Sequence, residues 1–98
     1  MQVDRICKVI PCISDPWKLR VILYLDEMPD LQMFARHLEG RYAERLGVVM
    51  VRSGRRELSF FSDGKVTVRE VDDVDEAEDL VNHLINMVYH KQFIFEEQ

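Results

Sequence analysis

The sequence predicts an α+β domain, an antiparallel sheet of four to six strands with two helices on one face. Residues 57–61 and 66–70 are rich in β-forming side chains, and Asp63-Gly64 between them suits a two-residue hairpin turn. A long amphipathic helix follows, because apolar residues recur at helical spacing. These residues are Ala77, Leu80, Val81, Leu84, Ile85 and Val88. The apolar side of the hairpin and the stripe on the helix are expected to bury each other.

The first part of the chain adds two strands and one helix. Residues 2–10 alternate weakly and 18–26 alternate clearly, which predicts two strands joined by a proline-bracketed loop. Residues 31–38 carry apolar side chains at i, i+3, i+4 and i+7. We therefore predict a short helix that Asp30 caps and Gly40 terminates.

The second half contains the remaining strands. Residues 41–46 are compatible with a short edge strand or with a loop, and 47–52 form a β-branched run that predicts a strand. The last helix begins after an acidic stretch, which suits the positive end of its dipole. It is expected to end near Gln92, and the apolar residues 93–95 are expected to pack back onto the domain.

Length and hydropathy indicate one soluble domain over residues 1–98. At 98 residues the chain has an ordinary domain size and can bury a core without a metal or a disulfide. Its longest apolar runs are far too short to span a membrane. Charged residues within the first fifteen positions do not fit a signal peptide. We therefore expect a cytoplasmic protein with no membrane association.

Charge is distributed unevenly around a net value of −5. Residues 41–69 contain seven basic and three acidic side chains, whereas 70–98 contain nine acidic side chains and only Lys91 as a cation. The basic part could contact phosphates or an acidic protein. Overall acidity argues against a dedicated nucleic-acid binder. The candidate binding residues are Arg52, Arg55, Arg56, Phe61, Lys65 and Arg69.

No residue pattern predicts a catalytic site, a metal site or a cofactor. The three histidines lack the spacing of zinc ligands, and the acidic run lacks the glycine of a calcium loop. Cys7 and Cys12 are expected to be free thiols. Cys12 lies between two prolines beside Asp15 and is a candidate reactive thiol, although this segment also fits a simple strand connection.

The second face of the predicted sheet is expected to be partly apolar. If the helices cover Leu58 and Phe60, the face opposite them carries Ser59, Phe61, Thr67 and Arg69, and Ile22 and Tyr24 join it. A partly apolar sheet face usually marks an interface. We therefore predict a homodimer or a protein partner.

The order of strand, helix, antiparallel strands and long final helix resembles one repeat of the TATA-box-binding protein. The resemblance covers roughly residues 18–93, including the hairpin through Ser62-Asp63-Gly64-Lys65. In that family, two repeats form a saddle that binds DNA through its concave face. The resemblance implies a fold, and a single repeat with an acidic charge balance does not imply DNA binding.

A second resemblance covers nearly the whole chain. Residues 10–22, IPCISDPWKLRVI, and residues 72–89 resemble the opening motif and last helix of a family of uncharacterised prokaryotic iron–sulfur proteins. In those proteins a domain of this size precedes a cysteine-rich module that binds a four-iron cluster. The present sequence has no such cysteine cluster, so the resemblance implies an accessory role beside one.

Taken together, these observations predict a non-enzymatic domain for protein interaction or self-association, and the second resemblance implies that it is the accessory half of an iron–sulfur protein. The alternative is nucleic-acid binding through the basic sheet face. Salt dependence separates the two readings, because phosphate contacts weaken steeply as salt rises.

Overall fold

The computed structural model has the predicted α+β architecture, with six strands in one antiparallel sheet ordered β1-β2-β6-β5-β4-β3. It describes residues 1–13 and 15–97, and the side chains of 1–13 and 15–89. The strands are β1 Val3–Pro11, β2 Leu19–Leu25, β3 Arg41–Ala43, β4 Val48–Ser53, β5 Arg56–Phe61 and β6 Lys65–Val71. The α-helices are α1 Leu31–Leu38 and α2 Val74–Glu97, and a 3-10 turn spans Glu44–Leu46.

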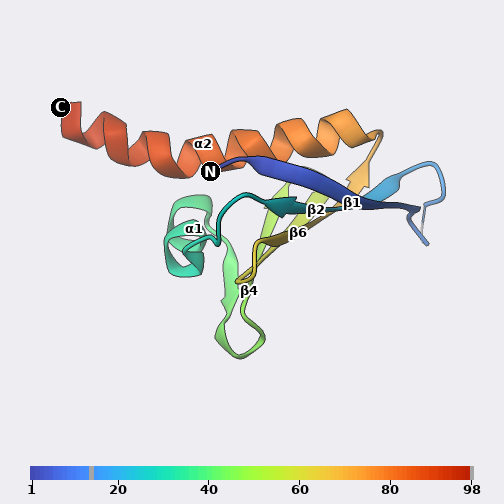
Figure 1. Cartoon of the computed structure of the whole chain (residues 1–98), viewed down its shortest axis with the longest axis horizontal. Coiled ribbons are helices and arrows are strands. Elements are labelled where there is room, and N and C mark those ends of the chain that lie inside the picture. Colours follow the sequence, from blue (N-terminus) through green and yellow to red (C-terminus); the bar gives the residue numbers. More distant parts are fainter. Residues whose placement is uncertain (14, 98) are drawn as a thin grey trace.

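Both helices pack on the same face of the sheet. In Figure 1, α2 runs along β1, β2 and β6, and α1 lies beside it near β3 and β4. The ring of Phe34 on α1 meets Phe60 on β5 edge to face, with 5.2 Å between centroids. The predicted stripe of α2 faces this core: Ala77, Val81, Leu84, Ile85 and Val88 are buried, and Leu80 is half-buried.

The start of α1 follows the prediction, but its end does not. The Asp30 carboxylate accepts a hydrogen bond from the Met33 amide at 3.2 Å, which caps the helix. Glu39, not Gly40, adopts the left-handed conformation after Leu38, with φ 53°. Gly40 is required for a different reason: a Cβ there would lie 2.7 Å from Val49 Cγ1. The glycine lets the chain pass close to β4.

The β5–β6 hairpin has three connecting residues rather than the predicted two. Gly64 has φ 97°, and its amide donates to the Phe61 carbonyl at 3.1 Å. The Asp63 carboxylate accepts a hydrogen bond from the Lys65 amide at 3.0 Å, which stabilises the turn where the chain enters β6. Asp63 itself has no positive φ, so this is not the two-residue turn that Asp-Gly often forms.

Two further boundaries and the register of β1 can be compared with the sequence predictions. Residues 41–46 divide between β3 and the 3-10 turn, so both open alternatives hold in part. The prediction that the last helix ends near Gln92 is wrong, because α2 continues to Glu97. The packing predicted for residues 93–95 lies outside the described side chains. Strand β1 has register shifts after Val3 and after Ile6, which explains its weak alternation in sequence.

Candidate binding face

The face of the sheet opposite the helices is the candidate functional site. Strand pairing arranges its side chains in three rows that cross the sheet, because paired residues in adjacent strands point the same way. The first row is Arg5, Tyr24 and Lys65; the second is Lys8, Ile22, Thr67, Ser59, Met50 and Arg41. The third contains Ile10, Arg20, Arg69, Glu57 and Arg52. Phe61, paired with Val48, lies at the opposite end of β5, beside Lys65 of the first row. We call these residues the open face.

Positive charge dominates the open face. Its rows contain seven cations, Arg5, Lys8, Arg20, Arg41, Arg52, Lys65 and Arg69, against the carboxylate of Glu57. Two further carboxylates, Glu39 and Glu70, border the same surface beside these arginines. The middle row has Lys8 at one end and Arg41 at the other, separated by the neutral side chains of four strands. Five inter-strand spacings separate those ends by about 24 Å. The open face is therefore a broad cationic surface within an acidic protein.

The third row and the end of the second border an open hollow of about 670 Å³. Glu57 lies in it and holds two arginines: Arg52 Nη2 is 2.7 Å from Glu57 Oε1, and Arg69 Nη1 is 3.7 Å from Oε2. Glu39 also lines the hollow, so three arginines and two carboxylates meet there and leave a small net positive charge. Arg41 and the 41% exposed Met50 complete this side of the hollow. The hollow thus combines cations at its rim with an apolar thioether.

The aromatic rings of the open face are already covered by cations of the same chain. The guanidinium carbon of Arg5 lies 4.7 Å from the Tyr24 ring centroid, and Lys65 Nζ lies 5.2 Å from that of Phe61. The sequence predicted a poorly covered apolar patch around Phe61. The structure instead shows half-buried rings beneath charged groups, so charge rather than apolar area distinguishes this face.

The structure brings together four of the six predicted binding residues. Arg52, Phe61, Lys65 and Arg69 lie on the open face. Arg56 points to the helix side and pairs with Glu76 of α2, and Arg55 lies in the β4–β5 turn. Sequence reasoning missed Arg5, Lys8, Arg20 and Arg41. Arg20 shares its side of β2 with Ile22 and could have been found, whereas the two irregularities of β1 conceal Arg5 and Lys8.

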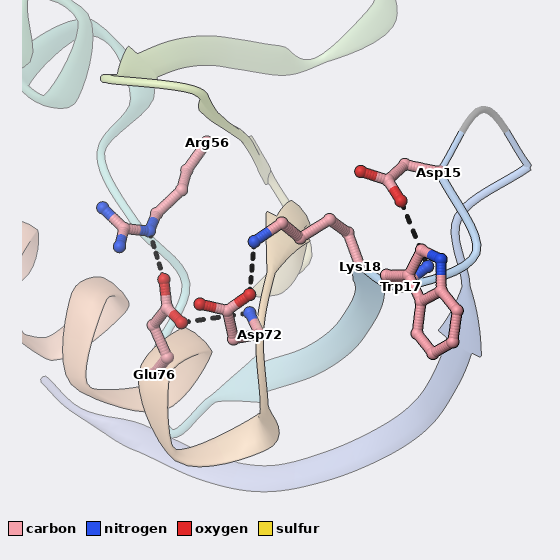
Figure 2. A network of polar contacts seen from close by, with 6 residues as sticks. All are labelled: Asp15, Trp17, Lys18, Arg56, Asp72 and Glu76. Atoms are coloured by element: carbon pink, nitrogen blue, oxygen red, sulfur yellow. Dashed lines mark hydrogen bonds and ion pairs between the residues drawn. The ribbon is translucent and has the colours of Figure 1, made fainter.

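A second polar cluster links the β1–β2 loop to the start of α2. Figure 2 shows Lys18 bonded to Asp72 and Arg56 bonded to Glu76, which also accepts from the Asp72 amide at 3.0 Å. The hydrogen bond from Lys18 lowers the pKa of Asp72 below its ordinary 3.8. The same bond raises the pKa of Lys18 above 10.5. These ion pairs join the sheet to the first turn of α2.

Replacing Lys18 with Met is expected to reduce the pH dependence of stability. Because the pKa of Asp72 is lower in the folded chain, its pair stabilises the fold above the ordinary carboxyl pKa. This contribution disappears as pH falls through the lowered value. The contribution of Lys18 is lost as pH rises through its raised pKa. Urea-unfolding midpoints across both ranges provide the measurement.

Lys8→Met is the matched control, since Lys8 lies on the open face and is paired in register with Ile22. The exposed Lys18 pair is expected to give a small, salt-sensitive effect. Identical pH profiles for Lys18→Met and Lys8→Met would contradict the role assigned to the Lys18–Asp72 pair.

The two cysteines differ in their exposure to solvent. Cys12, the candidate reactive thiol, is buried with 5% exposure, whereas Cys7 in β1 is exposed. Among the described residues, no three His, Cys, Asp or Glu side chains are grouped as metal ligands. No helix in the described part of the chain is long and apolar enough to cross a membrane.

No protein-family model, curated protein or solved structure matches the chain. The resemblances to the TATA-box-binding protein and to the iron–sulfur proteins therefore stay predictions. The open face and its charges are the basis for a functional proposal.

Proposed function

We propose that this chain is a non-enzymatic interaction domain that binds an acidic protein surface through its open face. The supporting observation is the excess of cations on a sheet face that neither helix covers, where seven cations lie with Glu57 and only Glu39 and Glu70 add negative charge at the border. Complementary charge speeds encounter and selects partners. Two copies of this face would repel each other, so self-association through two open faces is disfavoured.

Binding of labelled poly-glutamate, followed by fluorescence anisotropy, tests the proposal. Arg20→Glu is the informative variant, because Arg20 is exposed on the open face between Ile10 and the hollow. It is expected to weaken binding at least about tenfold, which corresponds to about 1.4 kcal/mol. Added salt should weaken binding of the unsubstituted chain as well.

Arg36→Glu is the matched control, since Arg36 is exposed on α1 and changes the net charge equally. It should leave poly-glutamate affinity nearly unchanged. Equal weakening by both substitutions would mean that net charge, not the open face, governs binding. Absence of poly-glutamate binding at low salt would refute the proposal.

Nucleic-acid binding is the second candidate, favoured by the presence of Tyr24 and Phe61 among the cations. Single-stranded nucleic acids combine backbone contacts with bases stacked on aromatic rings. The covering of both rings by Arg5 and Lys65 makes this reading weaker, because a base must displace a cation to stack. Oligo-thymidine that binds more tightly than poly-glutamate, and loses affinity in Tyr24→Ala, would favour nucleic acid over protein.

The resemblance to iron–sulfur proteins supports a narrower form of the proposal, in which the domain is an accessory partner to a cluster-binding module. An acidic module would complement the positive charge of the open face, whereas a basic module would be repelled by it. Co-purification of an acidic cysteine-cluster protein, lost in Arg20→Glu and retained in Arg36→Glu, is the expected result.

A further inference from the structure

The end of the molecule formed by the β1–β2 loop presents an exposed apolar tip. Trp17 is 88% exposed and Ile13 is fully exposed, although both are large apolar side chains. Figure 2 shows the Trp17 indole beside Asp15 and pointing away from the Lys18–Asp72 pair. Tryptophan is among the residues most often dominant in protein interfaces. A solvent-exposed indole at a loop tip is therefore a candidate anchor.

Hydrogen bonds hold the backbone on both sides of Trp17. The Asp15 carbonyl accepts from the Lys18 amide at 3.0 Å, and the Asp15 carboxylate accepts from the Trp17 amide at 3.1 Å. Pro16 fixes the backbone between them. The Cys12 amide donates to the Lys18 carbonyl at 2.9 Å and closes the loop. A backbone that is already ordered loses less conformational entropy on binding than a flexible one.

Acidic groups surround this tip. Asp72, bonded to Lys18, brings the start of α2 to the same end, together with Asp15, Glu70 and Glu76. Four carboxylates, Asp15, Glu70, Asp72 and Glu76, lie here with the three cations Lys18, Arg55 and Arg56. Asp73 and Asp75, at the start of α2, add negative charge next to Asp72 in the chain. The tip is therefore an apolar anchor in a net acidic setting.

The hollow of the open face has the complementary character. Arg41, Arg52 and Arg69 provide guanidinium groups, which stack on aromatic rings and pair with carboxylates, and Met50 provides apolar contact. The three arginines outnumber the carboxylates of the hollow, Glu39 and Glu57. Its volume of about 670 Å³ lies within the range of sites that accept a large side chain. Charge and hydrophobicity both match the tip of another copy of this chain.

We propose that the tip of one copy docks into the open-face hollow of a second copy, with Trp17 as the anchor. This rests on the proposed function and names the acidic surface as that of a second copy. The contact joins two different surfaces, so it is heterologous, and repeated contacts form rings or open chains rather than a closed twofold dimer.

Intrinsic fluorescence tests this directly, because Trp17 is the only tryptophan in the chain. Raising the protein concentration at low salt is expected to shift Trp17 emission to the blue and to increase the mass measured by light scattering. Arg41→Ala/Met50→Ala, which truncates two paired residues at the hollow, should abolish both changes. Arg36→Ala/Met28→Ala is the matched control, since it makes the same truncations at exposed sites on and before α1.

A mixing experiment identifies the two surfaces. Trp17→Ala retains the hollow but has no fluorophore, whereas Arg41→Ala/Met50→Ala retains Trp17 but lacks the hollow. Neither variant alone should associate, and mixing them should restore the blue shift in a particle of one copy of each. A monomeric mass with constant emission at every concentration would overturn the proposal, as would a shift that persists in Arg41→Ala/Met50→Ala.

Poly-glutamate binding separates this inference from the function on which it rests. If the chain stays monomeric while poly-glutamate still binds in an Arg20-dependent manner, only the second-copy partner is refuted. If poly-glutamate fails to bind as well, the open face has no role as an acidic-surface receptor.

Discussion

Phe60→Ala is expected to destabilise the fold by about 3–5 kcal/mol, the usual cost of removing a buried phenyl ring. Phe60 is fully buried on the helix side of β5, where it meets Phe34 and lies between Val49 and Val66 in neighbouring strands. Removing the ring leaves a cavity between α1 and the sheet. Since small domains are stable by only about 5–15 kcal/mol, the variant should be near its folding limit. Urea unfolding followed by circular dichroism measures the change.

Phe61→Ala is the matched control, because Phe61 is the next residue and points to the open face. It is half-buried beneath Lys65 rather than enclosed by the core. Its truncation should cost clearly less stability than Phe60→Ala. Equal losses for the two variants would mean that both faces of β5 are packed alike, which would contradict an uncovered open face.

Val81→Asp is expected to cost about 3–5 kcal/mol or more, because it places an unpaired carboxylate in the core. Val81 is fully buried on the side of α2 that faces the sheet. The carboxylate must either remain charged without a partner or become protonated, and both outcomes oppose folding at neutral pH. Loss of the cooperative thermal transition, or a strongly lowered midpoint, is the expected observation.

His83→Asp provides the comparison within the same helix. His83 is exposed, so an aspartate there keeps its hydration while carrying a similar helix-propensity cost. The fold should tolerate it with a change within about 1 kcal/mol. Severe destabilisation by His83→Asp would place the outer side of α2 against other structure and would refute the described packing.

Acidic groups lie at one end of the molecule and cations lie on the open face. The main functional question is therefore whether copies of the chain bind each other. Poly-glutamate binding asks whether the face recognises negative charge, and Trp17 emission asks whether a second copy supplies it. The two stability variants establish whether one sheet face is indeed left for such contacts. Together these experiments test whether the packing of the helices on one side of the sheet leaves the open face free for binding.

The sequence alone determined the α+β class and the inward and outward sides of the central strands. Alternation in residues 18–26 and 66–70, and helical spacing from Ala77 to Val88, follow directly from the geometry of strands and helices. Asp30 was identifiable as a cap because its carboxylate satisfies an amide within the same local segment. These features depend on neighbours in sequence.

Tertiary structure decided the composition of the binding face. Arg5, Arg41 and Arg69 belong to separate strands, and only the strand order with its register places them on one surface. It also directed Arg56 to Glu76, away from the face where the sequence had grouped it with Arg52. The physical reason is that a strand's own pattern fixes which residues share a side, whereas pairing between strands fixes which charges become neighbours.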